Sequence, residues 1–144
     1  MFFFALNFLL IVVFSFGQLN HLFTFWGIQT DLALVSVVVF SLFEKDWLRR
    51  CSLILLAILI LGFEPVFGFN TVFITAVFFL SVFLLDILKW EPAFNTILTI
   101  LIATILMNAG AFHVEAVVTE ALFNLLFAVP LALFMSLAFP RFKN

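Results

Sequence analysis

Charged residues are scarce in this chain of 144 residues. Lysine and arginine together number 6, aspartate and glutamate number 8, and all four make up 10% of the sequence. Soluble domains carry about 25% charged and about 45–50% apolar residues, whereas 67% of this chain is hydrophobic. A soluble fold of this length cannot bury such an apolar excess. The composition therefore predicts an integral membrane protein that is solvated by lipid.

Other residue types are rare in ways that exclude whole classes of function. The single cysteine, Cys51, excludes an internal disulfide. The only histidines, His21 and His113, lie far apart, and the five glycines form neither a phosphate-binding loop nor a Gly-x-Ser-x-Gly motif. The formal net charge of −2 argues against nucleic acid as a partner. We therefore expect no catalytic residue, no metal and no cofactor.

Long uncharged runs separate the few charged residues. A bilayer core about 30 Å thick needs roughly 20 apolar residues in a helix. The runs predict an all-α integral membrane protein, with one transmembrane domain over residues 1–144 and six helices. The sequence GQLNH at residues 17–21 ends the first helix, and the second and third helices are short for a bilayer. The expected helices cover residues 2–17, 27–43, 50–64, 70–88, 93–111 and 117–139.

The basic residues orient these helices, most clearly through the charged stretch FEKDWLRRC at residues 43–51. If the amino terminus is cytoplasmic, six helices place every basic residue on the cytoplasmic side. Because short cytoplasmic loops retain lysine and arginine, we expect both termini in the cytoplasm and a multi-pass protein. The residues that determine this topology are Lys45, Arg49, Arg50, Lys89, Arg141 and Lys143.

Acidic residues at membrane depth are candidates for function, because inserting a charge there costs about 2.5–3.5 kcal/mol on insertion scales. Asp31 opens the short second helix, either as a partner or ligand contact or as a helix-capping acid. Glu120 and Asn124 lie one turn apart on the last helix and are also candidate contacts. Glu120 is alternatively a first-turn acid stabilised by the helix dipole. Asp86 is expected to form an interfacial ion pair with Lys89.

Two further patterns predict contacts between helices. In the fifth helix, Asn95 lies one turn from Thr99 and Thr104 lies one turn from Asn108, and polar side chains in lipid hydrogen-bond across helices. In the last helix, the small residues Ala128, Ala132 and Ser136 recur every four positions and let another backbone approach closely. This strip is the expected helix-packing face, and its neighbour is either a helix of the same chain or a partner's helix.

The stretch QTDLALVSVVVFSLFEKDWLRR resembles a region of the MreD family of rod-shape-determining membrane proteins. In that family a Pro-Asp-Leu motif opens the second helix and a basic hairpin follows. Asp31 and Leu32 match this motif, while Thr30 replaces the proline. The similarity covers the helix and the charged turn after it.

Two later stretches resemble the same family. FEPVFGFNTVFI is similar to a loop in which Gly-Leu-Asn-Ala leads into the fourth helix, and Gly68 and Asn70 match. TEALFNLLFAVPLALFMSLAFPRF is similar to the family's last helix, where an asparagine precedes an apolar run, a proline and a short basic tail. Asn124 and Pro130 are the matching residues there.

The resemblance implies a non-enzymatic scaffold of the bacterial cell-wall elongation machinery, located in the inner membrane. Its implied partners are membrane lipid, an MreC-like protein and, through that protein, the peptidoglycan synthases. The alternative is a small substrate-binding membrane subunit of a transporter, similar to the S-components of vitamin uptake. Such a subunit needs a pocket where polar groups converge. Its candidates on the outer side are Asp31, Glu64, His113, Glu115 and Glu120.

Overall fold

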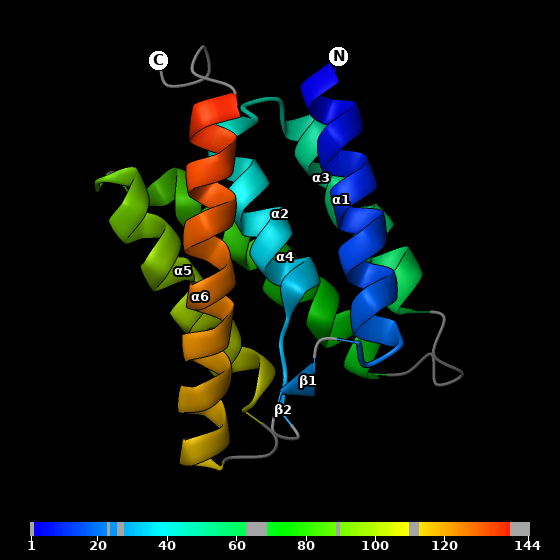
Figure 1. The fold of residues 1–144 in the computed structure, drawn as a ribbon, viewed down its shortest axis with the longest axis vertical. Coiled ribbons are helices and arrows are strands. Elements are labelled where there is room, and N and C mark those ends of the chain that lie inside the picture. The colour runs from blue at the N-terminus through cyan, green and yellow to red at the C-terminus, as the bar shows by residue number, and fades with distance from the viewer. Residues whose placement is uncertain are drawn as a thin grey trace.

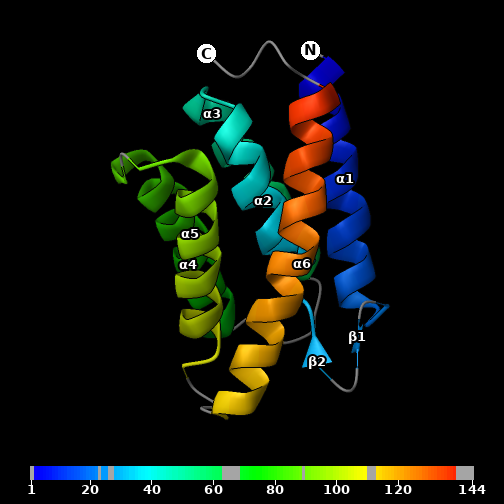
Figure 2. The same cartoon turned by 60° about the vertical axis from the view of Figure 1, so that its left-hand side comes forward.

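Six α-helices form an antiparallel bundle in the computed structural model, which describes residues 2–22, 24–25, 28–62, 69–88, 90–109 and 113–138. The helices are α1 (Phe2–Leu19), α2 (Leu32–Phe43), α3 (Trp47–Leu61), α4 (Phe69–Ile87), α5 (Pro92–Met107) and α6 (Val114–Ala138). The amino end of α1 and the carboxyl end of α6 lie at the same end of the bundle (Figures 1 and 2). The prediction of an all-helical fold with six helices is confirmed, with one short hairpin added.

Helix α2 occupies the middle of the bundle and packs against each of the other five helices. Every residue from Leu32 to Ser41 is buried. A helix that is apolar all round is stable only when it is surrounded, and the run LALVSVVVF meets that condition. The one polar side chain within this run, Ser36, donates its hydroxyl to the Leu32 and Ala33 carbonyls of its own helix.

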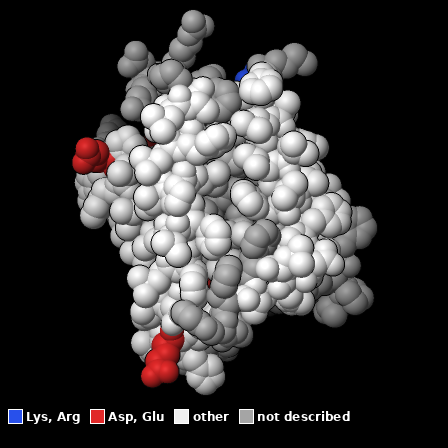
Figure 3. Space-filling view, viewed as in Figure 1, with Lys and Arg blue, Asp and Glu red and all other residues white. Residues whose placement is uncertain are grey.

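The outside of the bundle carries large apolar side chains. Leu137 is 80% exposed and Val72 is 69% exposed, whereas the polar residues Asn7 and Asn124 are fully buried. Figure 3 shows one face of the molecule with almost no charged residue along its middle. Soluble proteins avoid large exposed apolar patches, and exposed apolar side chains of this kind suit contact with lipid.

Helix lengths differ widely. Helices α1 and α6 are long and apolar enough to cross a membrane, while α2, α5 and the part of α4 from Thr71 are apolar but shorter.

The expectation that the second helix starts at residue 27 was wrong, because α2 begins at Leu32. Strands β1 (Thr24–Phe25) and β2 (Ile28–Gln29) pair antiparallel before it. Thr24, Phe25 and Ile28 are β-branched or aromatic and favour extended backbone.

The other helix boundaries differ from the expected ones for local reasons. Helix α3 begins three residues early, at Trp47, because the Asp46 side chain accepts a hydrogen bond of 3.0 Å from the Leu48 N–H. Helix α5 ends at Met107 with a turn after it. Helix α6 begins at Val114, three residues earlier than expected. Residues 27, 63, 64, 110, 111 and 139 of the expected helices lie outside the described residues.

A buried arginine links three helices at the charged end of the bundle. The Arg50 guanidinium donates to both Asp86 carboxylate oxygens, at 2.7 and 2.8 Å, and its Nε donates to the Glu44 carbonyl. Asp86 was expected to pair with Lys89, which lies outside the described residues. The structure gives Asp86 a partner that the sequence spacing did not suggest. Arg50 therefore ties α3 to α4 and to the end of α2.

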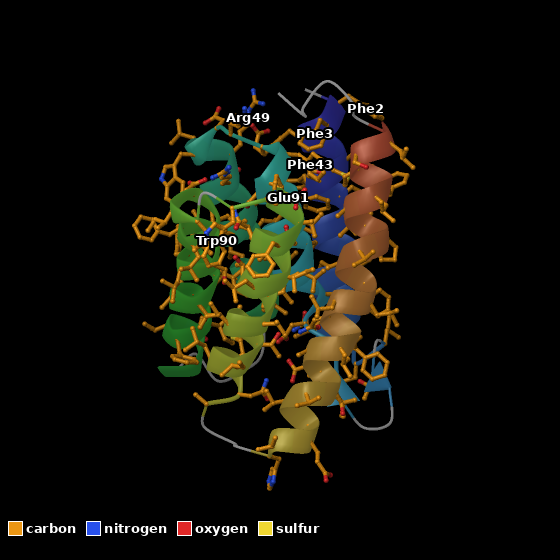
Figure 4. All side chains as sticks on the ribbon, turned by 90° about the vertical axis from the view of Figure 1, so that its left-hand side faces the viewer. Phe2, Phe3, Phe43, Arg49, Trp90 and Glu91 are labelled. Atoms are coloured by element: carbon orange, nitrogen blue, oxygen red, sulfur yellow. The ribbon has the colours of Figure 1, made fainter. Side chains whose placement is uncertain are left out.

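The described basic residues gather at the end of the bundle where α1 begins. Figure 4 shows Arg49 at this end, together with Phe2 and Phe3. Lys45 and Arg50 belong to the same turn and to the start of α3. Three of the predicted topology residues lie outside the described part of the chain: Lys89, Arg141 and Lys143.

Removal of the Asp86 carboxylate should destabilise the protein, because Arg50 is buried and would lose its charge partner. We expect Asp86→Ala to lower the free energy of unfolding by about 1–3 kcal/mol. Arg49→Gln is the matched control, because Arg49 is 49% exposed and exposed pairs contribute about 0–1 kcal/mol. Unfolding of the purified protein measures both values. Equal, small losses in the two variants would contradict the role assigned to Arg50.

Candidate functional site

The three residues predicted as contacts, Asp31, Glu120 and Asn124, meet inside the bundle. The Asp31 N–H donates to Asn124 Oδ1 at 2.9 Å, across 93 positions of sequence. The Glu120 carboxyl group is a neighbour of the Asp31 carboxyl group. Asp31 and Glu120 are each 9% exposed and Asn124 is fully buried. Sequence spacing grouped Glu120 with Asn124, and the fold brings Asp31 to them.

Asp31 lies at the buried amino end of α2, where backbone N–H groups need acceptors. Its side chain makes no capping hydrogen bond to its own helix, so the helix-capping interpretation was wrong. Gln18 of α1 takes that role instead: its Oε1 accepts from the Ala33 N–H at 3.1 Å, and its Nε2 donates to Asp31 Oδ1 at 2.8 Å. Side chains of α1 and α6 thus satisfy donors that a helix start always leaves open.

Glu120 lies beyond the first turn of α6, where the acidic residue is Glu115. The interpretation of Glu120 as a first-turn acid was therefore wrong. Its Oε2 accepts from Asn108 Nδ2 of α5 at 2.9 Å, and Asn124 Nδ2 donates to Thr104 Oγ1 at 3.0 Å. These contacts join α5 to α6. We call the whole set the central polar cluster: Gln18, Asp31, Thr104, Asn108, Glu120 and Asn124.

Two acidic side chains, Asp31 and Glu120, belong to this cluster, and both are almost fully buried. The amide groups of Gln18 and Asn108 each donate to one of the carboxyl groups. A buried carboxyl group without such donors would be costly. The cluster therefore fixes the position of four chain segments.

The side chains of the central polar cluster hydrogen-bond to one another. Three cavities, of about 350, 660 and 260 Å³, are lined by other described residues and by none of the cluster. Within the described ranges, no three residues of the types His, Cys, Asp and Glu lie close enough to hold a metal ion. The polar groups of the cluster therefore act on each other, from α1, the start of α2, α5 and α6.

Other residues singled out from the sequence lie away from the cluster. Ala128, Ala132 and Ser136 line the 660 Å³ cavity, which is a groove bordered by α2, α5 and α6. The strip thus faces helices of the same chain across an open groove. His113 and Glu115 are exposed at the start of α6. Glu64 lies outside the described residues.

The sequence analysis missed the role of Gln18, because it treated this residue only as part of the segment that ends the first helix. Helix α1 ends in a Schellman motif: the Leu22 N–H donates to the Gly17 carbonyl at 2.9 Å, and the His21 N–H donates to the Gln18 carbonyl at 3.0 Å. His21 takes the left-handed conformation this motif needs, with φ of 55°. The signal in the sequence was an amide in the last turn of an otherwise apolar helix, where lipid offers it no partner.

Loss of the Asn124 amide should weaken the contact of α6 with both α2 and α5. We expect Asn124→Leu to lower the free energy of unfolding by about 1–3 kcal/mol, because the buried Asp31 N–H loses its acceptor. Thr119→Val is the control, since the exposed Thr119 hydroxyl only bonds the Glu115 carbonyl of its own helix. Unfolding of both purified variants measures the difference. An Asn124→Leu protein as stable as the control would show that the cluster does not hold these helices.

No family model, no curated protein and no solved structure matches this chain. The similarity to the MreD family therefore rests on the short motifs described above. Two residues of those motifs, Asp31 and Asn124, are in direct contact. Of the other motif residues, Gly68 lies outside the described part of the chain, and Asn70 lies in the first turn of α4.

Proposed function

We propose that this protein is a six-span integral protein of the bacterial inner membrane, with both termini in the cytoplasm. In that membrane it acts as a non-enzymatic scaffold of the cell-wall elongation machinery, in the manner of MreD proteins. Its partners are an MreC-like membrane protein and, through it, the peptidoglycan synthases. Membrane lipid surrounds the bundle.

The distribution of polar and apolar side chains supports residence in the membrane. Large apolar residues cover the outside and amide side chains lie inside. Helix α2 has 12 residues, which at about 1.5 Å per residue gives about 18 Å, less than a bilayer core. The extended segment before it, with the buried residues Thr30 and Asp31, continues the span. Non-helical backbone at membrane depth is tolerated where protein surrounds it.

The internal hydrogen bonding of the central polar cluster is the observation that carries the scaffold proposal. A capture subunit needs polar groups that point into an open pocket. Asp31 and Asn124 instead bond to each other, and Asn124 and Glu120 bond to polar side chains at the end of α5. They favour one arrangement of helices over others, which a scaffold needs in order to present a constant outer surface. Two of the residues that match the MreD motifs, Asp31 and Asn124, hydrogen-bond to each other between the start of α2 and α6.

Depletion of the protein in the bacterium that encodes it tests this proposal. We expect depleted cells to widen and round while the protein's own copy restores their shape, and we expect an MreC-like protein to cross-link to it in intact cells. Uptake of small nutrients should be unchanged. Normal rods with reduced uptake of one compound would contradict the scaffold proposal and support the substrate-binding alternative.

A further inference from the structure

Two cavities adjoin each other at the charged end of the bundle. The first, of about 350 Å³, is lined by charged and polar residues, and the second is the 660 Å³ groove between α5 and α6. Leu42, Lys45 and Pro92 line both cavities. Figure 4 shows Phe43 and Glu91, which border the groove, at this end of the molecule. A ligand that enters one cavity therefore reaches the other past Lys45.

The groove is apolar along its length. Phe43, Ile97, Leu125 and Val129 line it, and the small side chain of Ala132 leaves it wide. Its volume lies within the range of about 300–1,000 Å³ that is typical of small-molecule sites. Leu133 borders the groove and is 58% exposed, so the groove reaches the outer surface. An acyl chain from the surrounding lipid matches this shape and chemistry.

The polar cavity and the adjoining end of the groove carry both signs of charge. Among the described residues, the ionisable side chains that line them are Lys45 and Arg50, which are basic, and Asp86 and Glu91, which are acidic. These four groups together give a formal charge of zero. A zwitterionic headgroup complements this arrangement, whereas a headgroup with net negative charge does not.

The side chain of Asn95 has a hydrogen-bond acceptor, Oδ1, that receives no hydrogen bond from the described residues. It is 5% exposed and lines the polar cavity. Its Nδ2 donates to the Leu88 and Trp90 carbonyls, while its Oδ1 has no hydrogen-bond partner among the described residues. A buried acceptor without a donor costs free energy unless a ligand or water fills the place. The missing partner is an N–H or O–H donor inside the cavity.

We propose that these two cavities form a binding site for phosphatidylethanolamine. Its primary ammonium group donates to Asn95 Oδ1 and lies near the Asp86 and Glu91 carboxylates, its phosphate lies by Lys45, and one acyl chain fills the groove. Phosphatidylcholine lacks the N–H donors, and phosphatidylglycerol lacks the positive charge. The site rests on the proposed location in the membrane and is independent of the role in wall synthesis.

Native mass spectrometry of the full chain in detergent tests the site. Phosphatidylethanolamine, phosphatidylcholine and phosphatidylglycerol with identical acyl chains are added in equal amounts. We expect phosphatidylethanolamine to be retained about tenfold more than phosphatidylcholine, the order expected for one charge-assisted hydrogen bond. Equal retention of these two lipids, or a preference for phosphatidylglycerol, would overturn the proposal even if the depleted cells lose their rod shape.

Two variants of α6 locate the lipid. Ala132→Phe fills the groove and should abolish the preference for phosphatidylethanolamine. Leu137→Phe makes a similar change at a residue that is 80% exposed and should leave the preference intact. Retention of phosphatidylethanolamine that is unchanged in Ala132→Phe would place the lipid elsewhere and refute the site. Thermal unfolding of both variants shows that each is folded. Lys45→Gln, which leaves the groove open, should lower the retention of phosphatidylethanolamine.

Discussion

The amino end of α2 is buried inside the protein, and the rest of the structure accommodates this constraint. A helix start leaves backbone N–H groups without partners inside the helix, and neither a buried site nor a lipid exterior offers water to them. Gln18 from α1 and Asn124 from α6 accept these hydrogen bonds. Because the acceptors come from both sides of α2, the helix can begin here only when α1 and α6 are in place.

A second constraint operates at the other end of α2. Arg50 holds the Glu44 carbonyl just beyond this helix and the Asp86 carboxylate at the end of α4. The apolar surface of α2 therefore lies between two polar anchors, one made of amides and acids and one made of a single arginine. Packing in lipid gains little from apolar contacts alone. Polar anchors of this kind fix the order of helices where the hydrophobic effect cannot.

The sequence predicted six helices from run length and composition, and it identified Asp31, Glu120 and Asn124 as residues that need an explanation. Their contact could not be predicted, because it depends on where α2 starts relative to α6. The late start of α2 accompanies the pairing of β1 with β2 before it, a tertiary feature with only weak local signals. Gln18 was missed because a single amide near a helix end has many ordinary explanations. The pairing of Arg50 with Asp86 joins residues 36 positions apart, and helical spacing does not report contacts of that kind.

Accessibility of single cysteines in intact cells measures most directly whether this bundle spans a membrane around a buried α2. With Cys51 replaced by serine, cysteines are placed at Lys45, Ser36 and His113, which represent the charged turn, the buried helix and the opposite end. The cysteine at 113 should react with an impermeant reagent added outside the cell. The cysteine at 45 should react only after the membrane is opened, and the cysteine at 36 only after denaturation. Reaction of positions 45 and 113 from the same side, or of position 36 in the native protein, would contradict the account.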